Sequence, residues 1–362
     1  MLVVRMFAAL ALLFGCDAIF RIDHVEAMGP ADADRFDCAV VGAGFIQACA
    51  GGPALNLTGA VSTDNNCAPV TYGASTFCLL VGDQVTVGDL AAVGSLPLVI
   101  AARHQLDLTG ILDASSLRIA TGPGARACAT PPGPDNMTAA GGGPGASGRT
   151  SGGRGGADAA NVRTPAPVTL PPTRELRGGC EGGTGGVSGA LGGTGGFGGG
   201  AVYLIAGDAI VVAATARITA SGEGGRGGHL TGMTTSSGGG GGGGGAGGMI
   251  VLDAPVTTLD LNAQMWANGG GGGAGGTRSA VGLPGGESTQ PPSHGAGAPP
   301  NGGAGATGNG AGTDGGIYTA LPPPAYIAAG GGGGGGTGWI FYYGATIAPA
   351  LDKISPPPAA GP

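Results

Sequence analysis

The sequence is short of charge, of aromatic side chains and of clustered basic residues. Charged residues make up 10% of its 362 residues and aromatic residues 4%, and the formal net charge is −7. The 15 Lys and Arg residues are scattered and are outnumbered by 22 acidic residues, whereas phosphate backbones are bound by clusters of basic side chains. Nucleic acid is therefore not an expected partner.

Residues that build metal and cofactor sites are also few. The histidines His24, His104, His229 and His294 lie far apart, and the seven cysteines form no CxxC pair, although a structural zinc site needs such ligands. Val40–Gln47 begins like a dinucleotide-binding turn, but Gln47 replaces the third glycine and no βαβ unit follows. We therefore expect neither a metal nor a cofactor.

The N-terminus has the pattern of an export signal. Arg5 is followed by Met6–Phe14, nine apolar residues, which are too few to cross a bilayer but suit the core of a signal peptide. Leu13-Phe14-Gly15-Cys16 resembles the lipobox of bacterial lipoproteins. This resemblance implies that Met1–Gly15 is removed, that Cys16 carries lipid, and that the exported protein is anchored in the cell envelope, at the outer membrane or cell surface. A secretory signal with an incidental cysteine is the alternative.

The remaining cysteines predict disulfides. An even number of cysteines in an exported chain is typical of a disulfide framework. The spacing of eleven residues that Cys38/Cys49 and Cys67/Cys78 share favours two local bridges, with a longer one between Cys128 and Cys180. Six cysteines allow about 15 pairings, so this connectivity is one hypothesis among several.

Units of about twenty residues recur along the chain, each with short stretches that alternate apolar and polar residues. They are Leu79–Ser95, Leu98–Ser116, Val202–Gly222, Met249–Gly269 and the degenerate Trp339–Ser355, with a partial copy at Ala54–Thr63. One unit cannot bury its own apolar face, so neighbouring units must stack. The repeat predicts an all-β fold, a parallel β-solenoid (β-helix) of five or six coils with long glycine-rich loop insertions. A β-sandwich of the same strands is the alternative.

Glycine-rich inserts leave these units at equivalent positions, after Ser116, Gly222 and Gly269. They include the uninterrupted glycine runs Gly238–Gly245 and Gly330–Gly336. Because glycine lowers the cost of any backbone path and adds no side-chain packing, we expect flexible surface loops. The alternative is a sheet-like mat of extended polyglycine chains held by backbone hydrogen bonds.

No catalytic set of residues stands out. Parallel β-helices can host polysaccharide-degrading enzymes with acidic groups on one strand face. The candidates here are Asp107, Asp113, Asp253 and Asp260, and we expect each to be an outward, solvated strand residue. His104 is expected to be a polar turn residue.

These features divide the chain into a signal peptide (1–15), a lipid-anchored linker (16–37), disulfide-containing first β-coils (38–120), a Pro/Gly-rich insertion (121–200), β-coils with glycine-rich loops (201–355) and a Pro-rich tail (356–362). The lipobox, the paired cysteines and Leu106–Ser116 with its glycine inserts resemble glycine-rich surface lipoproteins of bacteria, a resemblance that implies no established activity.

We therefore expect a non-enzymatic structural or adhesive envelope protein. Its expected partners are membrane lipid, through Cys16, and a polysaccharide or surface protein. Alternatives are a carbohydrate-binding or polysaccharide-degrading β-helix and an assembly scaffold for other envelope proteins.

Overall fold

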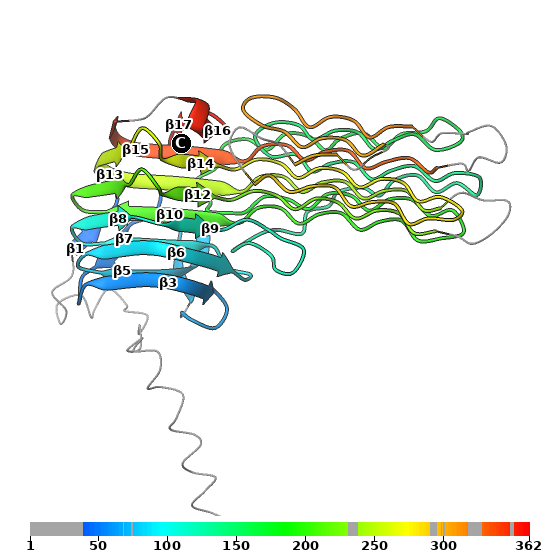
Figure 1. Cartoon of the computed structure of the whole chain (residues 1–362). Coiled ribbons are helices and arrows are strands. Elements are labelled where there is room, and N and C mark those ends of the chain that lie inside the picture. The colour runs from blue at the N-terminus through cyan, green and yellow to red at the C-terminus, as the bar shows by residue number, and fades with distance from the viewer. Residues whose placement is uncertain are drawn as a thin grey trace, which may run out of the picture.

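The computed structural model describes residues 39–67, 69–73, 75–230, 238–289, 295–297, 299, 301–317, 328–347 and 351–362. These residues form β-strands and extended chains, with no α-helix and one 3-10 turn, η2 (Leu351–Lys353). Figure 1 shows two parts: a stack of short strands, and a long bundle of extended chains that projects from one side of the stack. The predicted signal peptide (1–15) and Cys16, the predicted lipidation site, lie outside the described residues.

The stack is a 15-stranded sheet whose neighbouring strands are parallel, except for β4 (Pro69–Tyr72) against β5 (Ser75–Gly82). Three parallel ladders run through it. The first contains β5, β7 (Leu98–Ala102), β10 (Ala201–Ala206), β13 (Met249–Leu259), β15 (Trp339–Ile347) and β17 (Ala359–Ala360). The second contains β3 (Leu55–Ser62), β6 (Val85–Val93), β8 (Gln105–Leu108), β11 (Ala209–Val212) and the second half of β13. The third continues from β6 through β9 (Ile111–Asp113), β12 (Arg217–Thr219), β14 (Gln264–Trp266) and β16 (Ile354–Ser355).

Equivalent apolar residues of successive units lie directly above one another and fill the core. Leu98, Val202, Ile250 and Ile340 are register partners in the first ladder, and Leu112, Ile218, Met265 and Ile354 are partners in the third. Inward side chains from all three ladders belong to one buried cluster. The predicted stacking of repeat units on a shared core is therefore confirmed, and the antiparallel sheets of a β-sandwich are not what these strands form.

In the middle of the first ladder, strands β7 and β10 and the first half of β13 are buried on both faces. The outer face of this ladder packs against the antiparallel hairpin of β1 (Ala39–Val41) and β2 (Ala48–Ala50) and against Leu176, in a second apolar cluster. A strand that is covered on both sides is typically apolar at nearly every position. This explains why β7 and β10 read as continuous apolar runs, whereas β8 and β11 alternate buried and partly exposed residues.

The hairpin is fixed to the sheet by a buried carboxylate. Asp253, on the outer face of β13, accepts hydrogen bonds from the backbone N–H of Ala43 (3.0 Å) and Gly44 (2.8 Å) and from the Tyr203 hydroxyl (2.8 Å). Burial, followed by the Asp253 charge, raises the pKa of Tyr203. The expectation that Asp253 is a solvated strand residue is wrong, because it is fully buried and is the acceptor for this turn. The glycine-rich turn thus binds a carboxylate of its own chain.

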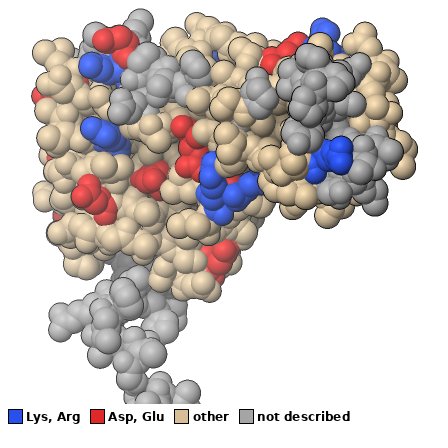
Figure 2. Space-filling view, turned by 45° about the vertical axis from the view of Figure 1, so that its right-hand side comes forward, with Lys and Arg blue, Asp and Glu red and all other residues tan. Residues whose placement is uncertain are grey.

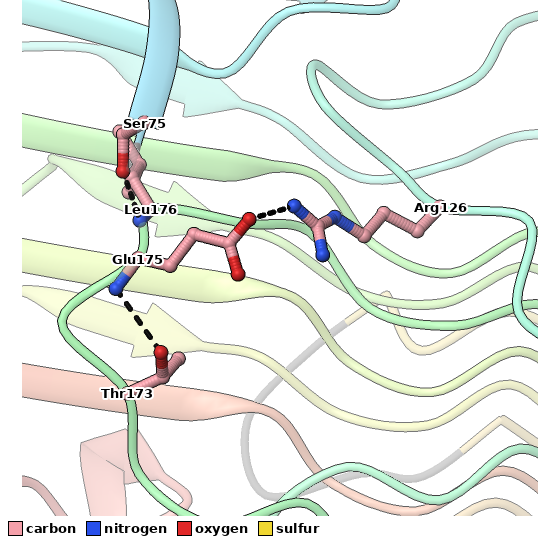
Figure 3. A network of polar contacts seen from close by, with 5 residues as sticks. All are labelled: Ser75, Arg126, Thr173, Glu175 and Leu176. Atoms are coloured by element: carbon pink, nitrogen blue, oxygen red, sulfur yellow. Dashed lines mark hydrogen bonds and ion pairs between the residues drawn. The ribbon is translucent and has the colours of Figure 1, made fainter. Parts of the chain in front are cut away.

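A second segment crosses the same side of the sheet (Figure 3). The Leu176 backbone N–H donates to the Ser75 hydroxyl at 2.9 Å, and the Leu176 side chain enters the second apolar cluster. The neighbouring Glu175 makes an ion pair with Arg126, and its backbone N–H donates to the Thr173 hydroxyl at 3.1 Å. The largest insertion is therefore attached to the strand stack.

Two disulfides have the pairing that the spacing favoured. Cys67 is bridged to Cys78, with Cα atoms 5.6 Å apart, and Cys128 is bridged to Cys180, with Cα atoms 5.3 Å apart. Cys49 is disulfide-bonded as well, and Cys38 lies outside the described residues. Because disulfides persist in oxidising compartments, the bridges indicate an extracellular or otherwise oxidising environment.

All three glycine inserts occupy one corner of the stack. In unit Leu79–Ser95, the short connection 94–97 joins β6 to β7 at this corner. In the later units, the inserts 114–200, 220–248 and 267–338 make the same connection, from the third ladder to the first. Asp113, Thr219 and Trp266, the last strand residues before the inserts, are register partners. The predicted equivalence of the exit points is therefore confirmed.

Within the bundle, the chain segments are joined by backbone hydrogen bonds with a period of three residues. Successive residues of segment 238–248 donate in turn to segments 220–229, 178–187 and 328–338, with N···O distances of 2.8–3.0 Å. The donor–acceptor pairs are Gly242–Arg226, Gly243–Gly183, Gly244–Gly333, Gly245–Glu223, Ala246–Cys180 and Gly247–Gly336. A helix of the polyproline II type has about three residues per turn and no internal hydrogen bonds, so its N–H groups point to three sides in rotation. The inserts have this pattern.

Two segments are surrounded by six others. Segment 238–248 also accepts hydrogen bonds from 139–148, 191–200 and 267–276. Segment 328–338 donates to 267–276, 139–148 and 312–317 and accepts from 238–248, 152–158 and 301–307. Every residue of both segments is buried. These segments contain the two uninterrupted glycine runs, because a Cβ atom there meets a neighbouring backbone: at Gly243 it would overlap the Pro144 carbonyl oxygen.

Outer segments keep glycine only on the sides that face other chains. Every third residue is larger: Glu181, Thr184 and Val187 in one segment, Leu191, Thr194 and Phe197 in the next, and Glu223, Arg226 and His229 in a third. With about three residues per turn, each set lies on one side of its helix. All of these side chains except that of Glu223 reach the surface.

The expectation of flexible glycine loops is wrong for the described inserts. Their backbone groups bond to other segments, which fixes each chain among its neighbours. The alternative predicted that extended glycine chains are joined by backbone hydrogen bonds, and the described inserts have these bonds. The arrangement, however, is a three-dimensional bundle, because the threefold rotation sends bonds out of any single plane.

Gly243→Ala tests this packing. We expect the variant to lose about 1–3 kcal/mol of unfolding free energy or more, because the added methyl group overlaps a backbone that cannot move alone. Gly310→Ala is the matched control, since position 310 is exposed and its Cβ would meet only the Thr307 carbonyl oxygen at 3.3 Å. Urea denaturation of both variants measures the difference, and equal stabilities would contradict the close-packed bundle.

Candidate functional site

The acidic residues singled out from the sequence are not brought together. Asp107 and Asp113 are partly exposed in different ladders, Asp260 is exposed in the turn after β13, and Asp253 is buried under the hairpin. Across the described residues there is no cluster of three or more His, Cys, Asp and Glu side chains that could hold a metal ion. No helix in this part of the chain is long and apolar enough to cross a membrane.

His104 lies on the turn between β7 and β8, as predicted. Its Nδ1 is 2.9 Å from an Asp208 carboxylate oxygen, and its Nε2 is 3.8 Å from one of Asp83. All three side chains are well exposed and belong to corresponding turns of successive units. This is a polar column on the outside of the stack, and within the described residues the imidazole is hydrogen-bonded to a carboxylate rather than to a serine, threonine or cysteine side chain.

A cleft of about 180 Å³ lies where the third ladder meets the bundle. Its strand side is formed by the outward residues Ile111, Asp113, Arg217, Thr219 and Trp266, and its other side includes Glu287. Trp266 is only 3% exposed, and its indole N–H has no hydrogen-bond partner in the described part of the chain. The cleft is therefore lined by two carboxyl groups, one guanidinium and part of a Trp side chain whose indole N–H is itself buried.

A column of side-chain hydrogen bonds marks the junction between strand and bundle geometry. Ser115, Ser221 and Asn268 occupy equivalent positions two residues beyond β9, β12 and β14. The Ser221 N–H donates to the Ser115 hydroxyl (3.0 Å), and the Asn268 N–H donates to the Ser221 hydroxyl (3.4 Å). These side chains accept bonds from backbone donors where the direct strand ladder ends.

Glu223 is a buried acid inside the bundle. It is 1% exposed; one carboxylate oxygen accepts from the Phe197 N–H (3.2 Å) and the other lies 2.8 Å from Arg226. Burial raises its pKa, and the charge of Glu287 adds to the shift, while the Phe197 N–H and the Arg226 charge oppose it. Arg226 also donates to the Arg118 carbonyl oxygen (3.1 Å), so the acid is linked to the loop beside the cleft.

This burial gives a pH-dependent stability. The pKa of Glu223 is higher in the folded than in the unfolded chain, so the folded state retains a proton that the unfolded state has released. We expect the unfolding free energy to rise as the pH falls from neutral through the folded-state pKa, and to level off below the unfolded-state value. Glu223→Gln should remove this rise, whereas Glu181→Gln, on the bundle surface, should keep it. Urea titrations between neutral and mildly acidic pH measure the effect, and an unchanged profile in Glu223→Gln would contradict it.

Exposed apolar side chains gather at the end of the bundle that lies farthest from the strands. They belong to the turns that join its segments, and Met137 and Leu191 are 79% and 69% exposed. We call this set the apolar tip: Met137, Val162, Val187, Leu191, Leu230, Val281, Leu283 and Ile317. In Figure 1 the strands β1 and β5 lie at the opposite end of the molecule from these turns.

Hydrogen bonds join the turns of the tip into one continuous arc. The Asn136 amide donates to Asp158, and its backbone N–H donates to the Val187 carbonyl oxygen. The His229 N–H donates to the Leu191 carbonyl oxygen at 3.0 Å. The Gly282 N–H donates to the Gly228 carbonyl oxygen and so joins the turn at 276–283 to the same arc. The turns that carry the apolar tip, except that of Ile317, are therefore joined to one another by hydrogen bonds.

Charged groups are sparse on the face of the molecule drawn in Figure 2. Figure 2 shows one face of the molecule, on which acidic and basic side chains form small separate groups amid uncharged residues. Neither sign dominates this face, in keeping with the 10% of charged residues in the sequence. Contacts made here would depend on shape and apolar area more than on long-range attraction.

Comparison of the chain with protein-family models, with curated proteins and with solved structures gives no match. The argument for function therefore rests on the geometry of the cleft and of the apolar tip. Neither was recognised from the sequence. The cleft residues are far apart along the chain, and the tip residues are single apolar residues at the ends of glycine segments. That position, repeated at several segment ends, is the signal that could have revealed the tip.

Proposed function

We propose that the protein is a non-enzymatic, lipid-anchored component of the cell envelope with a structural or adhesive role. In this proposal Cys16 carries the lipid, the strand stack is the body, and the glycine bundle is an arm whose apolar tip meets a partner. The apolar tip is the observation that carries the adhesive role, because contiguous exposed apolar surface marks interaction sites.

The body is best explained as a parallel β-solenoid. Each of the five longer repeat units contributes strand residues to all three ladders, and inward residues of the three ladders share one core. A chain that visits three ladders in the same order in every unit supports the winding of a solenoid coil, with the three inserts replacing one of its turns. The N-terminal hairpin lies on the body, so an anchor before it would leave the arm free to project.

Acylation and adhesion are tested together in the native host. Wild-type protein should incorporate labelled palmitate, and Cys16→Ser should not. A deletion strain should lose most of its whole-cell adhesion, and the Cys16→Ser strain should show the same loss, with the protein released into the medium. Absence of label from wild-type protein would contradict the anchor, and unchanged adhesion of the deletion strain would contradict the adhesive role.

A carbohydrate-binding or polysaccharide-degrading function is the second candidate, and the cleft favours it. Asp113 and Glu287 supply two carboxyl groups and Arg217 a guanidinium, and part of the Trp266 side chain lines the wall. Sugars are recognised by such directional polar groups next to aromatic surface. Of the four acidic residues singled out from the sequence, Asp113 lines the cleft, and Asp107, Asp253 and Asp260 do not.

Asp113→Asn tests the cleft. If envelope polysaccharide binds there or is cleaved there, we expect the variant to lose at least about tenfold in binding or turnover. Asp107→Asn is the matched control, since Asp107 lies in another ladder and does not line the cleft. Isothermal titration and release of reducing ends measure the two activities. Equal values in both variants would contradict the candidate.

A further inference from the structure

We propose that the apolar tip is a self-association surface, through which the arms of two copies of this protein dock end to end. This inference rests on the proposed adhesive function and names the partner of the same surface. Two copies anchored on neighbouring cells would then be joined by their tips.

The chemistry of the tip favours a protein surface over a membrane or a sugar. Its exposed apolar residues are aliphatic or Met, its described turns contain no Trp, Tyr, Phe or Lys, and of their two Arg residues Arg163 is paired with Asp314. Surfaces that enter a bilayer interface usually carry aromatic and basic residues, and sugar-binding surfaces usually offer an aromatic face. The net charge of −7 adds no attraction to anionic lipid.

The charges beside the tip are complementary to those of a second copy. Arg163 is 3.7 Å from Asp314 and is thereby paired within the chain. Asp135 and Arg278 make no ion pair with another described residue, and the Asp135 carboxylate accepts a hydrogen bond from the Val187 N–H at 2.7 Å. They lie in different turns of the arc, Asp135 in the turn before Ala139 and Arg278 in the turn after Gly276.

This distribution suits a twofold interface. In an isologous contact, a residue at one side of a patch meets a residue at the other side of the same patch on the partner. Two tips that face each other would place each Asp135 against the Arg278 of the other copy, around a centre of Met137, Val187, Leu191 and Leu230. Because the turns are fixed by backbone hydrogen bonds, little ordering is required on binding.

Sedimentation of the exported full chain with Cys16→Ser, which removes lipid-driven association, tests the apolar contact. We expect a concentration-dependent dimer that Leu191→Glu weakens at least about tenfold. Leu261→Glu is the matched control, since Leu261 is 74% exposed but lies on the strand stack, and it should leave the dimer intact. A monomer at all concentrations would overturn the proposal, as would equal dimerisation of both variants.

A charge exchange tests the geometry. Asp135→Arg and Arg278→Asp should each weaken the dimer about tenfold, because each places like charges opposite one another. An equimolar mixture of the two variants should restore association, since every substituted side chain then meets the opposite charge. Failure of the mixture to recover would overturn the twofold arrangement.

Two further experiments distinguish membrane binding and adhesion to another partner from tip-to-tip docking. Flotation with phosphatidylcholine–phosphatidylglycerol vesicles would overturn the proposal if wild-type protein binds, Leu191→Glu does not, and no dimer forms. In cells, adhesion that is lost on deletion but kept by the Leu191→Glu strain would preserve the adhesive function and overturn tip-to-tip docking. Loss of adhesion in both strains supports the proposal.

Discussion

The structure depends on the hydrogen bond between backbone N–H and C=O groups of neighbouring glycine segments. A polyproline II helix satisfies none of these groups by itself and in isolation leaves them to water. Segments 238–248 and 328–338 are buried along their whole length, so neighbouring segments must supply the partners. The ordering of glycine is entropically costly, and the bundle offsets that cost by bonding backbone groups that would otherwise be buried without partners.

The strand stack determines where those segments begin. The bundle interior has almost no apolar side chains, whereas the stack has a continuous apolar core. Since Asp113, Thr219 and Trp266 are in register, the segments that follow them start side by side. Ser115, Ser221 and Asn268 then bridge the change from strand to threefold helix. The apolar core thus supplies the alignment, and the bundle extends it away from the body.

Sequence patterns revealed the stack better than the bundle or the functional surfaces. Period-two alternation and repeated units predicted the parallel strands, and spacing favoured the Cys67–Cys78 and Cys128–Cys180 pairs that the structure contains. Glycine content was interpreted as flexibility because glycine has no side chain whose pattern reveals burial. The useful signal was the residue that interrupts glycine, as at Leu191, Thr194 and Phe197, every third position. Asp253 was misassigned because its partners, at Ala43 and Gly44, are more than two hundred residues away.

The threefold repeat also limits how such a chain can change in length during evolution. One extra residue within a segment turns everything beyond it by about a third of a revolution, and each donor then points to the wrong neighbour. Three extra residues restore the direction but lengthen only one limb of a hairpin. Viable insertions and deletions should therefore come in triplets, matched between an outgoing segment such as 220–229 and the segment 238–248 that returns beside it. The length of the arm would change in discrete steps, while its cross-section stays the same.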